Sequence, residues 1–303
     1  MPGICENRVV IVTGAGGGLG RAYALALAAE GARVVVNDLG VGTHGEASQT
    51  AGAAQAVVDQ IVAQGGQAVA NTDDVTEVEG GQRMVQTALD AFGDLHAVVN
   101  NAGFVRDRMF VSCTPEEWDA VLRVHLRGHF CTSRAAVDYW RAKQKRGLNP
   151  DARIINTSSG AGLQGSIGQS AYSAAKGGIA SLTLVQAGEL GRYGITANAL
   201  APAARTRMTE TAFAESMKAP EDGFDANDPA NVAPTVVWLA SDQSAEVTGQ
   251  VFELKGGLIM LSEGWRNGPG VNQGRRWSPS EVGPVVADLL ARRTPAQAVY
   301  GAA

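Results

Sequence analysis

The eight residues TGAGGGLG, from Thr13 to Gly20, decide the fold, because they stand between a short apolar run and an Ala-rich segment of helical character. In this setting Gly14 permits a tight turn, Gly18 lets backbone amides approach a pyrophosphate, and Gly20 lets the helix pack closely on the preceding strand. The helix, beginning near Leu19, offers unpaired N–H groups and a partial positive charge to phosphates. The stretch therefore predicts a strand, a dinucleotide-binding turn and a helix. The alternative is a glycine-rich turn without a ligand.

The rest of the chain repeats this alternation of strand and helix. Short runs rich in Val and Ile are separated by segments long enough for crossover helices. The runs lack polar alternation, as expected for strands that are covered on both faces. They predict an α/β fold with a doubly wound parallel sheet. The runs are Arg8–Val12, Arg33–Asn37, Gln67–Asn71, Leu95–Asn100, Ala152–Thr157, Ile195–Leu200 and Gln250–Leu254.

Two segments interrupt the alternation. Gly40–Gln55 is a long Gly/Ser/Ala-rich insert after the second run, and Gly264–Ser280 is rich in Gly, Arg and Asn. The second segment separates the last run from a helical stretch near the C-terminus. We therefore expect residues 1–262 to form one domain and residues 263–303 to form a C-terminal extension ending in a short helix.

Two capping signals mark helix starts. Thr114-Pro115-Glu116-Glu117 predicts a capping box with Pro at the first helical position, opening one long helix that includes Trp118. Ser278-Pro279-Ser280-Glu281 has the same form. Pro284 would then lie inside that helix and remove a hydrogen bond, so Gly283 is an alternative start.

Composition excludes several classes of protein. The 303 residues include 25 Lys and Arg against 30 Asp and Glu, a formal charge of −5, so we expect no nucleic-acid or membrane partner. The three cysteines predict neither a disulfide framework nor a zinc ribbon. The early apolar run Val9–Val12 is too short for a signal peptide, so we expect a cytoplasmic protein. The 38 glycines indicate a backbone that turns tightly or approaches a ligand closely.

Asp38 indicates which dinucleotide binds. It ends the second run, 18 positions beyond Gly20, where a carboxylate can accept hydrogen bonds from the adenine ribose hydroxyls and would repel a 2′-phosphate. No Arg or Lys lies in the glycine turn or directly after Asp38. The cofactor is therefore predicted to be NAD rather than NADP. Asp74, which we expect to end the third strand, is a candidate adenine contact, with a plain turn residue as the alternative.

A second group of residues has the chemistry of a general acid and base. Tyr172 and Lys176 stand four residues apart, so they project from one helical face. Tyrosine titrates near pH ~10, and a nearby ammonium favours the phenolate. Ser159 follows the fifth run, where its hydroxyl can bind the same substrate oxygen as Tyr172.

The order and spacing of these motifs resemble those of the short-chain dehydrogenases/reductases. The likeness rests on the glycine turn, Asn100-Asn101-Ala102-Gly103, Ser159 and Tyr172xxxLys176, and spans about residues 5 to 262. It implies a seven-stranded Rossmann-type sheet and NAD(P)-dependent interconversion of alcohols and carbonyls. It further implies that Tyr172 is the general acid/base, that Lys176 binds the nicotinamide ribose and lowers the tyrosine pKa, and that Ser159 orients the substrate oxygen. The implied cofactor contacts are Gly14, Gly18, Leu19, Gly20, Asp38, Asp74, Val75, Asn100, Asn101, Ala102, Gly103, Tyr172 and Lys176.

A narrower likeness suggests the substrate. Four stretches of sequence resemble the (3R)-hydroxyacyl-CoA dehydrogenase part of peroxisomal multifunctional enzyme type 2. They are Gly20–Leu25, Val35–Gly40, Asn101–Arg108 and Val124–Gly128. This implies oxidation of 3-hydroxyacyl-CoA thioesters, including bulky or steroid-derived acyl groups. The rivals are a hydroxysteroid dehydrogenase or 3-oxoacyl reductase, a catalytically silent NAD-sensing regulator, and a structural interaction module.

The resemblance leaves one site residue and the assembly open. His125 stands where the wider family has Asn in a proton relay to the lysine, so we include it as a candidate catalytic residue. The sequence places no obvious carboxylate ligand near His125, His129 and Cys131, so no metal site is predicted. Arg205, Arg207 and Lys218 are candidates for CoA phosphates or for solvated surface charge. The resemblance also implies a homodimer or homotetramer.

Overall fold

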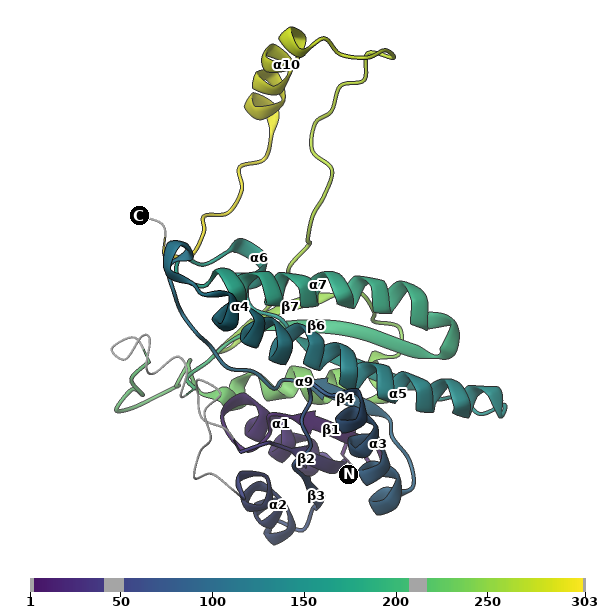
Figure 1. Ribbon diagram of the computed structural model, residues 1–303. Coiled ribbons are helices and arrows are strands. Elements are labelled where there is room, and N and C mark those ends of the chain that lie inside the picture. The colour runs from purple at the N-terminus through teal and green to yellow at the C-terminus, as the bar shows by residue number, and fades with distance from the viewer. Residues whose placement is uncertain (1–2, 41–51, 207–216, 302–303) are drawn as a thin grey trace.

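An eight-stranded sheet with the order β3-β2-β1-β4-β5-β6-β7-β8 forms the centre of the molecule (Figure 1). The computed structural model describes residues 3–40, 52–206 and 217–301. The strands from β1 to β7 pair in parallel, and β8 pairs antiparallel with β7. The strands are β1 Val9–Thr13, β2 Arg33–Asn37, β3 Gln67–Asn71, β4 Ala97–Asn100, β5 Ala152–Thr157, β6 Ile195–Ala203, β7 Val251–Lys255 and β8 Leu258–Leu261. The doubly wound α/β sheet predicted from sequence is confirmed.

The eighth strand was not predicted. β8 joins β7 through the two-residue turn Gly256-Gly257, and Leu258 pairs with Lys255. All four residues of β8 are exposed, so the strand lacks the buried pattern of the other runs. Two glycines between apolar runs are a hairpin signal that could have identified it.

Helices cover both faces of the sheet. On one face α1, α2 and α9 pack around Tyr23, Leu27 and Ile61 in a buried apolar cluster. On the other face α3, α5 and α7 pack around Met84 and Trp140. The helices are α1 Gly18–Ala29, α2 Ala53–Ala63, α3 Val78–Phe92, α4 Pro115–Leu122, α5 Gly128–Lys145, α6 Gly160–Gln164, α7 Ser170–Leu190, α9 Ala233–Ala240 and α10 Pro279–Arg292.

The long helix expected after Thr114 is divided. Thr114 and Glu117 form the predicted capping box at the start of α4. A π-helical turn, Arg123–Arg127, then separates α4 from α5, so the helix that carries Trp118 ends at Leu122. Such turns are frequent at functional sites, and this one places His125 beside the candidate catalytic residues.

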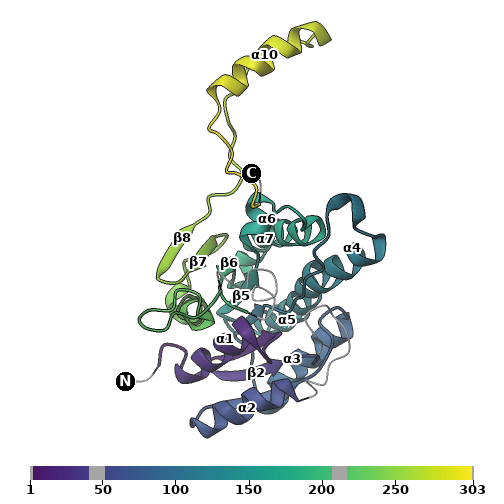
Figure 2. The same cartoon turned by 90° about the vertical axis from the view of Figure 1, so that its left-hand side faces the viewer.

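The C-terminal segment leaves the body of the protein and returns to it. Residues 263–278 contain no helix or strand, and α10 lies apart from the sheet and its helices (Figures 1 and 2). The helix begins at Pro279 rather than at Gly283, and it keeps Pro284 inside. Residues after α10 run back to α6, where Tyr300 forms a β-bridge with Ser166.

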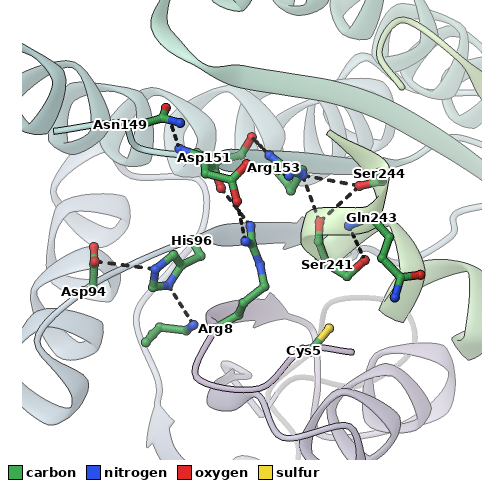
Figure 3. Close-up of polar contacts among 12 residues, drawn as sticks. Cys5, Arg8, Asp94, His96, Asn149, Asp151, Arg153, Ser241, Gln243 and Ser244 are labelled. Atoms are coloured by element: carbon green, nitrogen blue, oxygen red, sulfur yellow. Dashed lines mark hydrogen bonds and ion pairs between the residues drawn. The ribbon is translucent and has the colours of Figure 1, made fainter. Parts of the chain in front are cut away.

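Paired charges hold the amino ends of the central strands together (Figure 3). Asp151 accepts hydrogen bonds from Arg8 Nη1 and Arg153 Nη2, each at 2.7 Å. Arg153 also donates to the carbonyl of Ser241 at 3.1 Å and to the hydroxyl of Ser244 at 3.3 Å. Burial acts to raise the pKa of Asp151, but the hydrogen bonds from both arginines outweigh it and hold that pKa below its usual value. We call this side of the sheet, formed by the amino ends of the strands, the amino edge. The opposite side, formed by the carboxyl ends of the same strands, is the carboxyl edge, and it holds the candidate site.

Candidate active site

The glycine turn lies against the loop that follows β4. Gly14 and Gly18 adopt φ values of +62° and +52°, which residues with side chains rarely adopt. A Cβ on Gly14 would lie 2.7 Å from the Cα of Ala102, so the two backbones are in direct contact. Gly17, at the N-cap of α1, is extended and has no capping side chain. The first amides of α1 thus have no capping side chain, and their binding to a pyrophosphate stays a prediction.

Asn101 fixes the shape of this turn. Its Nδ2 donates to the carbonyls of Thr13 at 3.0 Å and Gly14 at 3.2 Å. The Thr13 hydroxyl in turn accepts from the backbone amides of Asn101 at 2.9 Å and Ala102 at 3.1 Å. Thr13 was not among the predicted site residues, although its place at the end of β1 was a signal. The Leu19 side chain packs against the apolar cluster, and a contact of its backbone with the cofactor stays a prediction.

Asp38 lies beside the glycine turn. Its Oδ2 accepts from the Gly16 amide and its Oδ1 from the Gly40 amide, both at 2.8 Å. A Cβ on Gly16 would lie 2.8 Å from Oδ2, so this close approach requires glycine. A carboxylate held between two amides at the end of β2 fits the ribose of a dinucleotide. Most of the insert that follows, residues 41–51, lies outside the described residues.

Asp74 and Val75 lie in the loop after β3, not at the strand end. β3 ends at Asn71, and Asp74 Oδ1 accepts from the Thr76 amide at 2.8 Å. The Val75 side chain is buried against α5, close to Gly128. Asp74 therefore already stabilises its own turn, and an adenine contact stays a prediction.

Ser159, Tyr172 and Lys176 lie together at the end of β5. Ser159 is the N-cap of α6, and its hydroxyl lies close enough to Tyr172 on α7 to act to lower the pKa of that phenol. Lys176 Nζ lies 5.6 Å from the centre of the Tyr172 ring and donates to the Thr157 carbonyl at 2.6 Å. Ser158 Oγ donates to the Lys176 carbonyl at 2.8 Å, which ties α7 to the strand end. The three predicted residues, two that carry a hydroxyl group and one that carries an amine, are thus neighbours.

Burial dominates the charges of this group. It lowers the pKa of Lys176 to about 7, and no ion pair of Lys176 occurs within the described residues. Burial also raises the pKa of Tyr172, against the hydrogen bond from Ser159 and in the same direction as the charge of Asp107. A lowering of the tyrosine pKa by the lysine, which the family resemblance implies, stays a prediction.

His125 lies behind the tyrosine ring. The two rings meet edge to face at 5.2 Å, and Nε2 of His125 is 2.7 Å from the Phe104 carbonyl oxygen. Burial and the Lys176 charge lower the His125 pKa to about 3, against the hydrogen bond to Phe104, so the imidazole is neutral at pH 7. Its Nδ1 has no hydrogen-bond partner among the described residues. A Cβ on Gly103 would overlap this ring, which explains the glycine there.

Other candidates are occupied elsewhere or lie outside the described residues. His129 Nε2 accepts from the Thr157 amide at 3.2 Å, and Cys131 donates to the Thr76 carbonyl. Within residues 3–40, 52–206 and 217–301, no three His, Cys, Asp or Glu side chains gather as metal ligands. Arg205 is paired with Asp225, and Arg207 lies outside the described residues. In the same described part, no helix is long and apolar enough to cross a membrane.

Comparisons with known proteins agree with this geometry. The model of a family described as short chain dehydrogenase matches residues 8–218. The hydroxyacyl-CoA dehydrogenase ChsB1 of Mycobacterium tuberculosis is 43% identical over 299 residues, covering 96% of this chain and 91% of that protein. The peroxisomal multifunctional enzyme type 2 of Mus musculus is 49% identical over 254 residues, which cover 84% of this chain but only 32% of that enzyme.

A solved structure supports the same assignment over the whole chain. The crystal structure of a short chain dehydrogenase from Mycobacterium avium is 57% identical and superposes with a TM-score of 0.89. The match covers 99% of this chain and 100% of the crystallised one, so it includes the C-terminal extension. Fold, motifs and relatives agree, and the chain is an oxidoreductase that belongs to the short-chain dehydrogenase family.

Proposed function

We propose that this protein is an NAD-dependent dehydrogenase that oxidises a (3R)-3-hydroxyacyl-CoA to the 3-oxoacyl-CoA. The observation that supports it most is the grouping of Ser159, Tyr172 and Lys176 at the carboxyl ends of the strands, where the glycine turn also lies. Two relatives that match most of this chain are named a hydroxyacyl-CoA dehydrogenase and a peroxisomal multifunctional enzyme. Bulky or steroid-derived acyl groups belong to the same proposal.

In this proposal each residue has a separate task. Ser159 holds the substrate oxygen, and Tyr172 takes the hydroxyl proton in oxidation or returns it in reduction. Lys176 provides the positive charge that favours the phenolate once it is fully protonated. The bound nicotinamide supplies the hydride acceptor. His125 keeps the Tyr172 ring in place, and its Nδ1, which has no partner among the described residues, can accept a hydrogen bond behind that ring.

The choice of NAD rests on Asp38. Both oxygens of this carboxylate lie beside the glycine turn, where a 2′-phosphate would meet a like charge. Asp38→Ala should weaken NAD binding by about tenfold and relax the discrimination against NADP. Asp59→Ala, on the exposed side of α2, is the matched control and should change neither the affinity for NAD nor the discrimination against NADP. Unchanged cofactor preference in Asp38→Ala would contradict the role of this carboxylate.

A substrate panel tests the activity. The purified protein is assayed for NAD reduction with (3R)- and (3S)-3-hydroxyacyl-CoA thioesters of graded chain length, steroid acyl-CoAs, free hydroxysteroids and acyl-carrier-protein thioesters. We expect the highest kcat/KM with a (3R)-CoA thioester. A higher kcat/KM with a free hydroxysteroid or a carrier-protein thioester would contradict the proposed substrate and identify that compound class instead. NAD binding without turnover of any alcohol would support a regulator instead.

Assembly, location and domain limits complete the proposal. We propose a homo-oligomer formed through α5 and α7, whose outer surfaces expose Phe130, Leu184 and Val185. Light scattering on the purified protein tests it, and a monomer would refute it. All three cysteines are thiols, which fits a cytoplasmic enzyme. The catalytic domain is proposed to end near residue 262, where the extension begins.

A further inference from the structure

The loop between the two proposed catalytic hydroxyls is held from both sides by distant parts of the chain. It runs from Ser159 through α6 to Gln169, the N-cap of α7. Gly165 and Gly168 within it have φ values of +82° and +78°. Two glycines with left-handed φ make an unsupported loop of this kind free to adopt other conformations. Its position, and with it the distance between the two hydroxyls, depends on outside contacts.

One side of the loop is fixed by the segment before η1, the short 3-10 turn Phe110–Ser112. The Arg108 amide donates to the Gly168 carbonyl at 2.7 Å. The Gln169 side chain donates to both oxygens of Asp107 at 3.0 Å. These contacts support the half of the loop next to Tyr172.

The other side is fixed by the last described residues of the chain. The Tyr300 amide donates to the Gly165 carbonyl at 3.1 Å, and the Ile167 amide donates to the Tyr300 carbonyl at 2.9 Å. The Val299 side chain lies 3.4 Å from where a Cβ on Gly165 would be. The C-terminus thus adds a short parallel strand segment beside the loop, more than 130 positions away in sequence.

The Tyr300 side chain reaches the residue next to Ser159. A Cβ on Gly160 would lie 2.8 Å from the Tyr300 Oη and 3.0 Å from Cε2, so the phenol lies directly on the Gly160 backbone. Burial raises the pKa of Tyr300, and the nearby Gln164 side chain at the end of α6 acts against it. The phenol therefore lies against the short helix whose N-cap is Ser159.

We propose that Tyr300 is a positioning residue that holds α6, and hence the Ser159 hydroxyl, in register with Tyr172. The proposal rests on the proposed roles of Ser159 and Tyr172. It also gives a function to the return of the C-terminal extension after α10, because the extension ends against the helix that begins at Ser159. Its consequence is that the last residues of the chain affect turnover of the alcohol and leave cofactor binding unchanged.

Four variants test the proposal. A chain ending at Ala298 removes the whole contact, whereas a chain ending at Gly301 keeps it and is the matched control. Tyr300→Ala removes the ring, and Tyr300→Phe keeps the ring on Gly160 but loses the hydroxyl. Val286→Ala, on the exposed side of α10, is a further control within the extension.

The kinetic result separates positioning from general stability. In the chain ending at Ala298 and in Tyr300→Ala, we expect kcat/KM for the alcohol to fall about tenfold or more, with the KM for NAD unchanged. Tyr300→Phe should stay within about threefold of the full chain, and both controls within about twofold. An equal loss in kcat/KM for the alcohol and in the KM for NAD would overturn the proposal. A kcat/KM for the alcohol within twofold of the full chain in the chain ending at Ala298 would also overturn it.

A second measurement does not depend on the reaction. Amide hydrogen exchange of the 160–169 loop should be at least about tenfold faster at Ile167 in the chain ending at Ala298 than in the chain ending at Gly301. Equal exchange at Ile167 would refute the contact itself. If the full chain oxidises no alcohol but Ile167 loses protection, the proposed function fails and the contact stands.

Gly160→Ala tests the same contact from the other side. The added methyl group would displace the Tyr300 ring, so this variant should lose activity in the full chain. In the Tyr300→Ala background the same substitution should have a much smaller effect, because the two residues act through one contact. Additive losses would show that Gly160 acts independently of Tyr300 and would contradict the proposal.

Discussion

At the amino edge of the sheet, Arg8, Asp151 and Arg153 are buried or half-buried and each is paired, whereas Lys176 at the carboxyl edge is buried and donates to a backbone carbonyl. The pKa values follow this difference. Hydrogen bonds from the arginines hold the pKa of Asp151 low despite its burial, while burial lowers the pKa of Lys176 to about 7. One edge keeps its charges at neutral pH, and the other keeps a group that titrates there.

The two edges therefore have different uses. Charges that are paired and hydrogen-bonded at the amino edge join strands that are far apart in sequence. A buried lysine that has no ion pair among the described residues costs stability, and groups perturbed in this way cluster at functional sites. Substitutions of the same type at the two edges should consequently change different quantities, stability at one and turnover at the other.

The largest expected effect is the loss of turnover in Tyr172→Phe. Removing the hydroxyl removes the proposed proton acceptor, so kcat should fall by about 10³-fold or more. The ring still packs on His125, and NAD affinity and unfolding free energy should change little. Steady-state kinetics and NAD titration measure these quantities. Full activity of the variant would refute the mechanism.

Tyr139→Phe is the matched substitution at the amino edge. The Tyr139 hydroxyl is hydrogen-bonded to Asp94 at 2.7 Å, where Lys143 also contacts this carboxylate. Its loss should cost about 1–2 kcal/mol in unfolding free energy and leave kcat unchanged. A fall in kcat comparable to that of Tyr172→Phe would show that the two edges are not separate in function.

The second effect is the loss of stability in Asp151→Asn. This variant leaves Arg8 and Arg153 without their carboxylate, a change that costs about 3–5 kcal/mol for a fully buried pair. Asp151 is 35% exposed, so we expect about 2–3 kcal/mol in urea unfolding, with kcat unchanged. Asp138→Asn, which breaks an exposed pair with Arg134, should cost less than about 1 kcal/mol. Equal costs in the two variants would contradict the structural role of the amino edge.

The sequence predicted the carboxyl edge better than the amino edge for a physical reason. The glycine turn, Asp38, Ser159 and the Tyr172–Lys176 pair are local patterns, and parallel strands bring their carboxyl ends together whatever the loops do. Arg8 and Asp151 are 143 positions apart and have no local signature. Their pairing follows only once the strand order is known.

Three features of the site also depend on contacts between distant segments. Asn101 was expected to contact the cofactor, and the structure uses its side chain to hold the Thr13 and Gly14 carbonyls. The π-helical turn around His125 interrupts a continuous helical pattern without any Pro or Gly inside it. Tyr300 reaches α6 only because the extension returns, which no periodicity indicates.

The third effect concerns the sign of a stability change. Lys176→Met removes a buried amine, so the free energy of unfolding at pH 7 should rise by about 1–2 kcal/mol while turnover is lost. Lys143→Met removes a partner of Asp94, to which it donates at 2.6 Å, and should instead lower stability by about 1–2 kcal/mol with kcat retained. Urea unfolding of both variants at one pH decides between these signs, and destabilisation by both would remove the distinction.

The same lysine predicts how stability varies with pH. Its pKa is about 7 in the folded protein and 10.5 without the fold, so between these values the unfolded chain binds a proton that the folded chain does not. This group therefore makes stability rise as pH increases from 7 to 9. The rise should be smaller in Lys176→Met than in the unchanged protein, and an equal rise would contradict the low lysine pKa.

The smallest expected effect is a pH dependence of stability at the amino edge, which occurs below pH 7 rather than above it. His96 Nδ1 accepts from the Val9 amide at 3.0 Å, and burial lowers the His96 pKa to about 4 against the charge of Asp94. Between pH 6.5 and 4 the unfolded chain binds the proton and the folded chain does not, so this group lowers stability as pH falls from 7 to 5, by about 1 kcal/mol or slightly more. His96→Asn keeps an acceptor for Val9 but does not titrate, so its loss of stability between pH 7 and 5 should be smaller by that amount. Urea unfolding at the two pH values measures the difference. If the variant and the unchanged protein lose stability equally, the imidazole is not held neutral by burial, and the amino edge is more open to water than its paired charges imply.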